Sequence, residues 1–346
     1  MEEKLNNEEQ RGTFESLTQE DLEELEKRPK TKSEIILDRI IIFLPFLMAM
    51  VAFIEYIYWP HDPRRVATAL YSYFILIQAG IMLVFAIVSL FNKNVFRKFR
   101  YKAPFYTVVY IIFTVYDILT LKTGKLMLPY FPWVDQVFNS AWADRAYLWE
   151  CIYNSVYLLL KGYFIGAILG IITGLFCGYF KSVRYWISPF MKLLGAIPSM
   201  TWLPIIMVLA STLHRAAVFV IALGVWFALT TATMTGIRTI DTRLFDAAKT
   251  LGATQKNLIL NVAVPSAMPN IFSGLVQGMS TACTALLVAE MVGVESGLGW
   301  YITWQKSWAN FDKMYAAIVI ICLVFLTVNF VLNTIQRKVL KWKEQI

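Results

Sequence analysis

The chain has few charges, few cysteines and few histidines for its 346 residues. Charged residues make up 16% of it, whereas a soluble domain has about 25%, which excludes a typical soluble enzyme. The four cysteines stand far apart without a CxxC or Cys/His spacing, and the two histidines share no motif with other ligand residues. No GxxxxGK[ST] phosphate loop is present. We therefore expect no metal site, no catalytic residues and no bound nucleotide in this chain.

Hydrophobic residues are abundant instead, at 58% of the chain with a mean hydropathy of +0.55. A helix that crosses a bilayer needs about 20 apolar residues. Eight stretches qualify, of which the third is the shortest: 40–58, 68–91, 105–121, 155–180, 187–210, 216–235, 271–292 and 314–332. The sequence predicts an all-α membrane protein, a polytopic bundle of about eight transmembrane helices.

The distribution of charge predicts how the chain lies in the membrane. No apolar run opens the chain, so we expect no cleavable signal peptide. Residues 1–38 are polar and rich in acids, and most loop Lys and Arg residues lie on the same side as this tail. Arg64 and Arg65 oppose the bias. By the positive-inside rule, we expect both termini in the cytoplasm and the basic loops beside lipid headgroups. The scattered positive charge does not suggest nucleic-acid binding.

The predicted organisation has three parts. Residues 1–38 form an acidic cytoplasmic tail, 39–99 form an extension with two spans, and 100–346 form the remaining six-span domain, with a cytoplasmic loop at 238–268. The extension either braces the core or recognises a partner.

The loop at 238–268 reads as two short helices joined by an elbow. Asp241 and Thr254 suit the N-cap positions of the two helices, and Gly252 suits the left-handed residue that ends the first. We expect Pro265 to end the second helix.

Glycines recur at every fourth position of the fourth span, which places them on one ridge of the helix. Such a ridge lets a neighbouring helix approach backbone to backbone. We favour this packing role over a direct role in a transport path. The five residues are Gly162, Gly166, Gly170, Gly174 and Gly178.

The same loop resembles a known signature. Asp246-Ala247-Ala248, three residues, Gly252, nine residues and a stretch ending in Pro265 resemble the "EAA" motif of the membrane subunits of binding-protein-dependent ABC importers. The chain departs from the usual Glu, Ile and Leu with Asp246, Val262 and Val264.

Further stretches resemble the branch of permeases for nitrate, taurine and alkanesulfonates. Residues 194–198 with 202–204 are similar to "aiPplallP", and 289–291 with 296–300 are similar to "aE…sGlGy". Residues 154–156 with 161–162 are similar to "SL…R…G". The resemblance covers about residues 104–340 and leaves out the first hundred.

This resemblance implies a six-helix permease core in a bacterial inner membrane, used as a homodimer. Two separate ATPase subunits would use ATP and Mg and dock on Asp246, Ala247, Ala248, Gly252 and Pro265, and an extracytoplasmic binding protein would deliver cargo. Nitrate, alkanesulfonate or taurine is the favoured cargo, and a cofactor precursor such as a pyrimidine is the alternative. An ion-coupled secondary transporter is the other class, although it would need dense carboxylate or histidine relays.

Five residues are candidates for the translocation path or gate. Pro198 and Pro204, with Trp202 between them, should bend or break the fifth span, which either exposes carbonyls to a cavity or is only a packing kink. Lys161 either attracts an anion or extends to the interface. Glu290 is expected to hold helices together or support a gate, because it would repel an anion.

Overall fold

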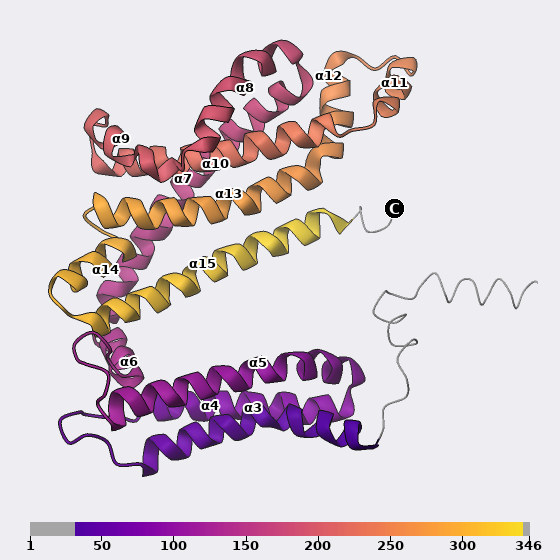
Figure 1. Cartoon of the computed structure of the whole chain (residues 1–346). Coiled ribbons are helices and arrows are strands. Elements are labelled where there is room, and N and C mark those ends of the chain that lie inside the picture. The colour runs from indigo at the N-terminus through magenta and orange to yellow at the C-terminus, as the bar shows by residue number, and fades with distance from the viewer. Residues whose placement is uncertain (1–31, 342–346) are drawn as a thin grey trace, which may run out of the picture. The chain divides into compact units, whose positions relative to one another are not determined.

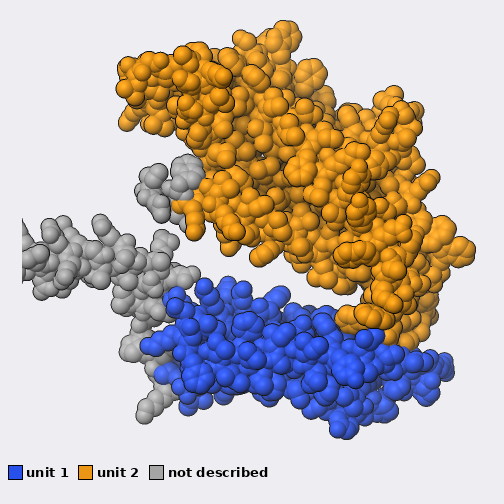
Figure 2. All heavy atoms as spheres, turned by 180° about the vertical axis from the view of Figure 1, so that it is seen from behind, with its two compact units in different colours: residues 1–124 blue, residues 125–346 orange. Residues whose placement is uncertain are grey.

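The computed structural model describes residues 32–341, and every regular element in this range is helical. The chain divides into two compact units, residues 1–124 and 125–346 (Figure 2). Most of the predicted acidic tail, residues 1–31, lies outside the described residues.

Unit 1 is a bundle of three long helices. They are α3 (Lys32–Tyr58), α4 (Leu70–Phe91) and α5 (Lys93–Asp117), and a π-helical turn, η1 (Ile118–Lys122), extends α5. Ile42, Ala86 and Phe99 bring one side chain from each helix into a shared apolar cluster.

The third span is longer than the predicted 105–121. The Asn92 side chain caps α5 by accepting hydrogen bonds from the N–H groups of Asn94 and Val95, and the helix then runs without a break to Lys122. Because α5 packs on α3 and α4, the division between units follows Gly124, whereas the sequence places the boundary at 99/100, inside α5.

Unit 2 contains the remaining helices (Figure 1). They are α6 (Val134–Ala143), α7 (Arg145–Tyr179), α8 (Lys181–Ala196), η2 (Ser199–Trp202), α9 (Leu203–Leu209), α10 (Leu213–Arg238), α11 (Thr242–Thr250), α12 (Gln255–Asn257), η3 (Leu258–Ala263), α13 (Val264–Val292), α14 (Leu298–Ser307) and α15 (Phe311–Val339).

Seven helices of the described range are long and apolar enough to cross a membrane, and an eighth candidate is the bent pair of 181–196 and 199–209. This confirms the predicted all-α bundle of about eight spans. Within unit 2, α10 packs between α7 and α13, and α15 lies beside α13. The α11–α12 region and α14 lie at opposite ends of this unit (Figure 1).

The glycine ridge of α7 faces α10 along its whole length. An added Cβ atom at Gly166 would lie 2.4 Å from the Ala222 carbonyl oxygen, and one at Gly170 would lie 2.7 Å from the Leu229 Cβ atom. Distances this short leave no room for a methyl group, so glycine allows the two backbones to touch. The other three ridge glycines are equally close to α10: Gly162 at Ile221, Gly174 at Thr233 and Gly178 at Ile237.

Candidate functional site

The segment 241–254 contains two capped helical starts separated by an elbow at Gly252. The Asp241 carboxylate accepts a hydrogen bond from the N–H of Arg243 (2.9 Å) and begins α11. The Thr254 hydroxyl accepts one from the N–H of Asn257 (3.4 Å) and begins α12. Gly252 has a φ of +79°, a left-handed conformation that only glycine adopts without cost. The caps and the elbow lie where the sequence predicts them.

The end of α11 has the two hydrogen bonds of a Schellman motif. The N–H of Ala253 donates to the Ala248 carbonyl (3.0 Å), and the N–H of Gly252 donates to the Lys249 carbonyl (2.9 Å). These bonds satisfy carbonyls that a helix end would otherwise leave open. The elbow therefore has a defined geometry, with Ala247 exposed beside it.

The surface of this segment is open and partly apolar. Leu251 is 88% exposed and Leu244 is 52% exposed, and an added Cβ atom at Gly252 would meet nothing within 4 Å. Asp246 is also exposed and pairs with Lys249 on the same helix over 3.2 Å. Two exposed leucines therefore lie on either side of Asp246, next to the Gly252 elbow.

Tyr179, at the end of α7, connects this segment to the bundle. Its ring meets the ring of Phe245 in α11 at 6.3 Å between centroids, and its hydroxyl donates a hydrogen bond to the Gln255 side chain in α12. The segment is thus attached to α7 on both sides of the Gly252 elbow, as well as through the chain to α10. Only the three-dimensional packing reveals this role, because Tyr179 belongs to no motif.

Pro265 does not end a helix, contrary to the prediction. The chain passes from α12 through the π-helical η3 into α13, and one helical span runs over 255–292. Pro265 lies in the first turn of α13. A proline is tolerated in the first turn of an α-helix, where its missing N–H removes no hydrogen bond internal to α13.

The fifth span is broken, as the prolines predict. Helix α8 ends at Ala196, Ile197 and Pro198 are not helical, and η2 and α9 continue at 91° to α8. Pro204 lies in the first turn of α9, after η2, so it does not itself form the bend.

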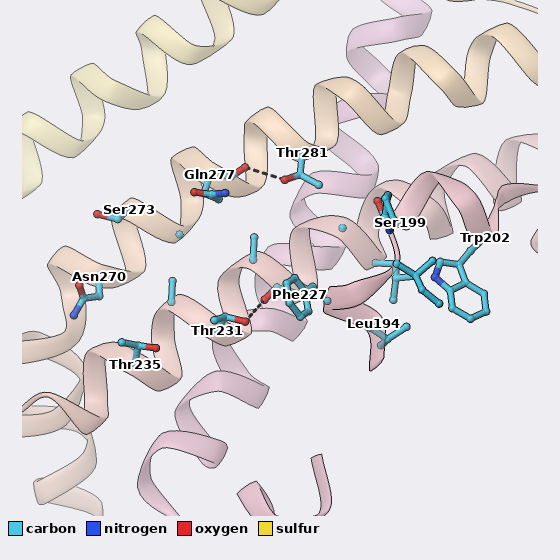
Figure 3. Close-up of a pocket in the computed structure, with 18 residues that line it drawn as sticks. Leu194, Ser199, Trp202, Phe227, Thr231, Thr235, Asn270, Ser273, Gln277 and Thr281 are labelled. Carbon is cyan, nitrogen blue, oxygen red and sulfur yellow. Dashed lines mark hydrogen bonds between the residues drawn. The ribbon is translucent and has the colours of Figure 1, made fainter. Parts of the chain in front are cut away.

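A cavity of about 540 Å³ opens beside this break, between η2, α10 and α13. Figure 3 shows Thr231, Thr235 and Phe227 along α10, and Asn270, Ser273, Gln277 and Thr281 along α13. Each row repeats at three or four residues, so each lies on one face of its helix. None of the residues from 32–341 that line this cavity is Asp, Glu, Lys, Arg or His.

The hydrogen-bonding groups of the cavity differ in availability. The hydroxyls of Thr231, Ser273 and Thr281 donate to carbonyls of their own helices. By contrast, the buried indole N–H of Trp202 has no hydrogen-bond partner within the described chain. A buried donor without a partner is costly, so this N–H is suited to an acceptor that enters the cavity.

Gly224 of α10 marks the place where three elements converge on this cavity. An added Cβ atom there would lie 2.8 Å from both the Ser199 hydroxyl oxygen in η2 and the Thr281 methyl carbon in α13. Gly224 is not part of a repeating glycine pattern like that of α7, so the sequence periodicity does not indicate this close contact.

The structure brings two of the five predicted path residues together. Pro198 and Trp202 line the cavity. Lys161 lies on a separate groove between α7, α8 and α10, and Pro204 lines neither space.

Glu290 is buried in a hydrogen-bonded connection between three helices. Its carboxylate accepts a bond from the Ser155 hydroxyl in α7 (2.7 Å) and another from the N–H of Gly299 in α14 (2.8 Å). The Ser155 oxygen in turn accepts a bond from the N–H of Leu298 (2.8 Å). The carboxylate and hydroxyl together cap the N-terminus of α14. This arrangement gives Glu290 a helix-joining role.

A second polar contact fixes the same end of unit 2. The Asp144 carboxylate pairs with the Lys313 ammonium at 2.8 Å and accepts a hydrogen bond from the Tyr301 hydroxyl at 2.7 Å. Partial burial acts to raise the pKa of Asp144, but the bonds from Lys313 and Tyr301 outweigh it and hold this pKa below its ordinary value. Burial, followed by the nearby Asp144, raises the pKa of Tyr301, which stays a donor.

Comparison with known proteins now assigns the chain. The profile of the binding-protein-dependent transport system inner membrane component family matches residues 166–344. The chain belongs to this family. The matched range begins inside α7, so unit 1 lies outside it. The resemblance read from the motifs is confirmed, and the chain is the permease subunit of an ABC importer, a membrane component that is not itself catalytic.

The relatives include permeases named for several small anions. The putative aliphatic sulfonates transport permease protein SsuC of Bacillus subtilis is 30% identical over 189 residues, which are 55% of this chain and 68% of that protein. The taurine transport system permease protein TauC of Escherichia coli is 23% identical and covers 58% of this chain and 73% of its own length. The nitrate import permease protein NrtB of Synechococcus elongatus is 25% identical, with 63% and 81% covered.

A solved structure agrees with the fold. An amino acid ABC transporter crystallised with histidines superposes with a TM-score of 0.51 at 18% identity, over 58% of this chain and 98% of that chain. Membership of the family implies an ATPase and a substrate-binding protein as partners in general.

Proposed function

We propose that two copies of this permease form one path for a small oxyanion such as an alkanesulfonate, taurine or nitrate. Both termini and the 241–254 segment face the cytoplasm of a bacterial cell, and an extracytoplasmic binding protein delivers cargo to the opposite side. Two ATPase subunits dock on the segment and use ATP with Mg. The relatives named for sulfonate, taurine and nitrate support the cargo class, at 23–30% identity.

The observation that carries this proposal is the chemistry of the 540 Å³ cavity. It offers the indole N–H of Trp202 and the side-chain amides of Asn270 and Gln277, and the described chain contributes no charged side chain to its lining. Neutral N–H donors suit the oxygens of an anion. Because no fixed cation is present, the anion is not held so tightly that its release is slow. The volume lies in the range of small-molecule sites, about 300 to 1,000 Å³.

Docking of an ATPase at 241–254 is proposed from the open surface of this segment. Leu251 and Gly252 are exposed at a rigid elbow, and Tyr179 connects that elbow to α7. Movement of the segment is therefore passed to the bundle as a rigid-body displacement.

The test is uptake into proteoliposomes that contain the permease with its co-purified ATPase and binding protein. We expect uptake of radiolabelled taurine, an alkanesulfonate or nitrate that requires hydrolysable ATP. Uptake that follows an imposed proton or sodium gradient without ATP would instead establish an ion-coupled secondary transporter.

A pyrimidine-type cofactor precursor is the second candidate cargo. The rings of Trp202 and Phe227 and the amides of Asn270 and Gln277 line the cavity, and these groups suit the faces and edges of a planar heterocycle. The same vesicles distinguish the two cargoes, because a labelled pyrimidine would accumulate while the sulfonate and nitrate would not.

We propose that unit 1 is an accessory unit. Its removal tests whether it stabilises unit 2 or binds a partner protein. Deletion must end at residue 124, because a cut at 99 would divide α5. If the shortened chain inserts normally in the membrane but no longer assembles with its partners, unit 1 binds a partner. If only its thermal stability falls, unit 1 stabilises unit 2.

A further inference from the structure

A second groove, of about 630 Å³, lies between α7, α8 and α10 and has a different chemistry from the cavity beside the break. Its walls are apolar and include Ile165 and Leu169 of α7 and Phe219 and Trp226 of α10. Among the described residues, Lys161 and Arg215 are the only charged side chains that line it. Its composition is therefore that of an amphipathic site with a positive end.

The charged end of the groove lies at the membrane surface opposite the 241–254 segment. Arg215 is in the first turn of α10, whose far end at Arg238 leads into that segment. The Lys161 ammonium lies 5.7 Å from the centre of the Tyr157 ring, and this ring stacks on His214 at 6.3 Å. Such a group of bases and aromatic rings is typical of the headgroup level.

The apolar part of the groove extends inward by about one leaflet. Trp226 lies eleven residues after Arg215 on the same helix, or about 16 Å at 1.5 Å per residue. A bilayer core is about 30 Å thick. The groove thus spans the distance from a lipid headgroup to the end of its acyl chain.

Neither cation has a counter-ion in the described chain. No ion pair between Lys161 or Arg215 and a carboxylate is present in residues 32–341. Two unpaired cations at the mouth of an apolar groove attract a ligand that is anionic at one end and apolar along the rest. A free inorganic anion would leave the apolar walls unused, and a second copy of the chain would need to bring a carboxylate to this level.

We propose that this groove binds an anionic phospholipid of the leaflet opposite the 241–254 segment. Lys161 and Arg215 hold the phosphate, and one acyl chain lies along Ile165, Leu169 and Trp226. The lipid occupies the joint between α8 and the α7–α10 pair, on the other side of Leu194 and Leu223 from the hydroxyl-lined cavity, since both residues line both spaces.

Trp226 provides the test, because brominated acyl chains quench the fluorescence of a nearby indole. The full chain is placed in phosphatidylcholine vesicles with a small fraction of brominated phosphatidylglycerol or of brominated phosphatidylcholine. The difference in quenching between the native chain and Trp226→Phe isolates Trp226 from the other tryptophans. We expect phosphatidylglycerol to quench Trp226 at a lower mole fraction than phosphatidylcholine does.

Variants at the two cations separate specific binding from general lipid contact. Lys161→Gln and Arg215→Gln should each weaken the preference for phosphatidylglycerol about fivefold, since a basic residue near a membrane surface contributes roughly that factor. Lys306→Gln removes an exposed charge on α14 that does not line the groove, and it should leave the preference unchanged. Lys161→Gln alone suffices if Arg215→Gln fails to fold.

Three results would overturn the proposal. Equal quenching by the two lipids removes the role of the cations. Relief of quenching by millimolar inorganic phosphate would identify a site for a free anion. Absence of quenching by either lipid, together with disulfide cross-linking of Leu169→Cys between two copies, would show that a second copy covers the groove.

Discussion

Ser155 in α7 donates a hydrogen bond of 2.7 Å to Glu290 in α13, although 135 residues separate them in the chain. Through this pair, two helices of the bundle jointly hold the first turn of a third, since Ser155 also accepts from Leu298 and Glu290 from Gly299. The end of unit 2 that carries α14 is therefore held together by buried polar contacts and not by apolar packing alone.

Replacement of this carboxylate should loosen that end of the bundle. Glu290→Gln exchanges one acceptor oxygen for a donor group, so one N–H or O–H loses its partner, and we expect a loss of about 1 to 3 kcal/mol in stability. Thermal unfolding in detergent measures the effect. Glu295→Gln is the matched control, because Glu295 is exposed on the adjoining loop. Equal melting temperatures for the two variants would contradict the helix-joining role.

The contact between α7 and α10 should not tolerate a methyl group. Gly170→Ala would place a Cβ atom 2.7 Å from the Leu229 Cβ atom, so we expect destabilisation by about 1 to 3 kcal/mol from overpacking. Gly80→Ala is the control: an added Cβ atom at Gly80 in α4 would meet nothing within 4 Å, so this substitution should be neutral or slightly stabilising. The idea fails if both substitutions change the melting temperature by the same amount.

A substitution at the elbow should uncouple transport without unfolding the protein. Gly252→Asp adds a side chain to an open surface, and aspartate tolerates the left-handed conformation better than most residues. We expect normal membrane insertion and a loss of substrate-stimulated ATPase activity in the assembled complex. Gly252→Asn, of the same shape, separates the effect of charge from that of bulk. Normal stimulation in Gly252→Asp would refute docking at this elbow.

Removal of the indole donor should weaken cargo binding specifically. Trp202→Phe keeps an aromatic ring in the cavity but removes the N–H that has no partner in the described chain. If an anion accepts a hydrogen bond from it, the affinity should fall about tenfold or more, since a bond to a charged group contributes roughly 1.5 to 3 kcal/mol. Labelled uptake at varied cargo concentration measures this, and basal ATPase activity is the control. An unchanged concentration dependence would exclude Trp202 from cargo contact.

The Asp144 contact gives a pH dependence of known sign. Lys313 and Tyr301 hold the pKa of Asp144 below its ordinary value of 3.8, so its contribution is fully present above that value and is lost as the pH falls through the lower folded-state pKa. We expect native stability to be flat from neutral pH to about pH 5 and to fall in more acid solution. Melting curves of the native chain and Asp144→Asn should converge there. Curves that stay parallel would contradict the ion pair.

The features predicted correctly from sequence depend on local chemistry. Asp241, Thr254 and Gly252 determine their caps and elbow through bonds within five residues, and Pro198 lies at the break in the predicted fifth span. The eight apolar stretches predict the spans for a similar reason, because burial in lipid requires length and composition and no particular partner.

The features that sequence could not predict depend on remote partners or on unusual helical turns. The sequence predicts that Pro265 ends a helix, but the π-helical η3 leads directly into α13 and Pro265 lies in the first turn of that helix. The hydrogen bond of Tyr179 to Gln255 joins residues 76 positions apart, and that of Ser155 to Glu290 joins residues 135 positions apart. The spacing of apolar residues along the sequence does not predict such long-range pairs. The sequence predicts too short a third span, because the basic first turns of α5 lower the mean hydropathy of that region.

The glycine ridge has a mechanical consequence. Because the five glycines place no α7 side chain between the two helices, α7 lies directly against the side chains and backbone of α10 over five successive turns. Both helices are attached to the 241–254 segment at the same end, α10 through the chain and α7 through Tyr179. A displacement of that segment therefore acts on both helices, and α7 extends from it to the end of unit 2 where Ser155 and Glu290 cap α14.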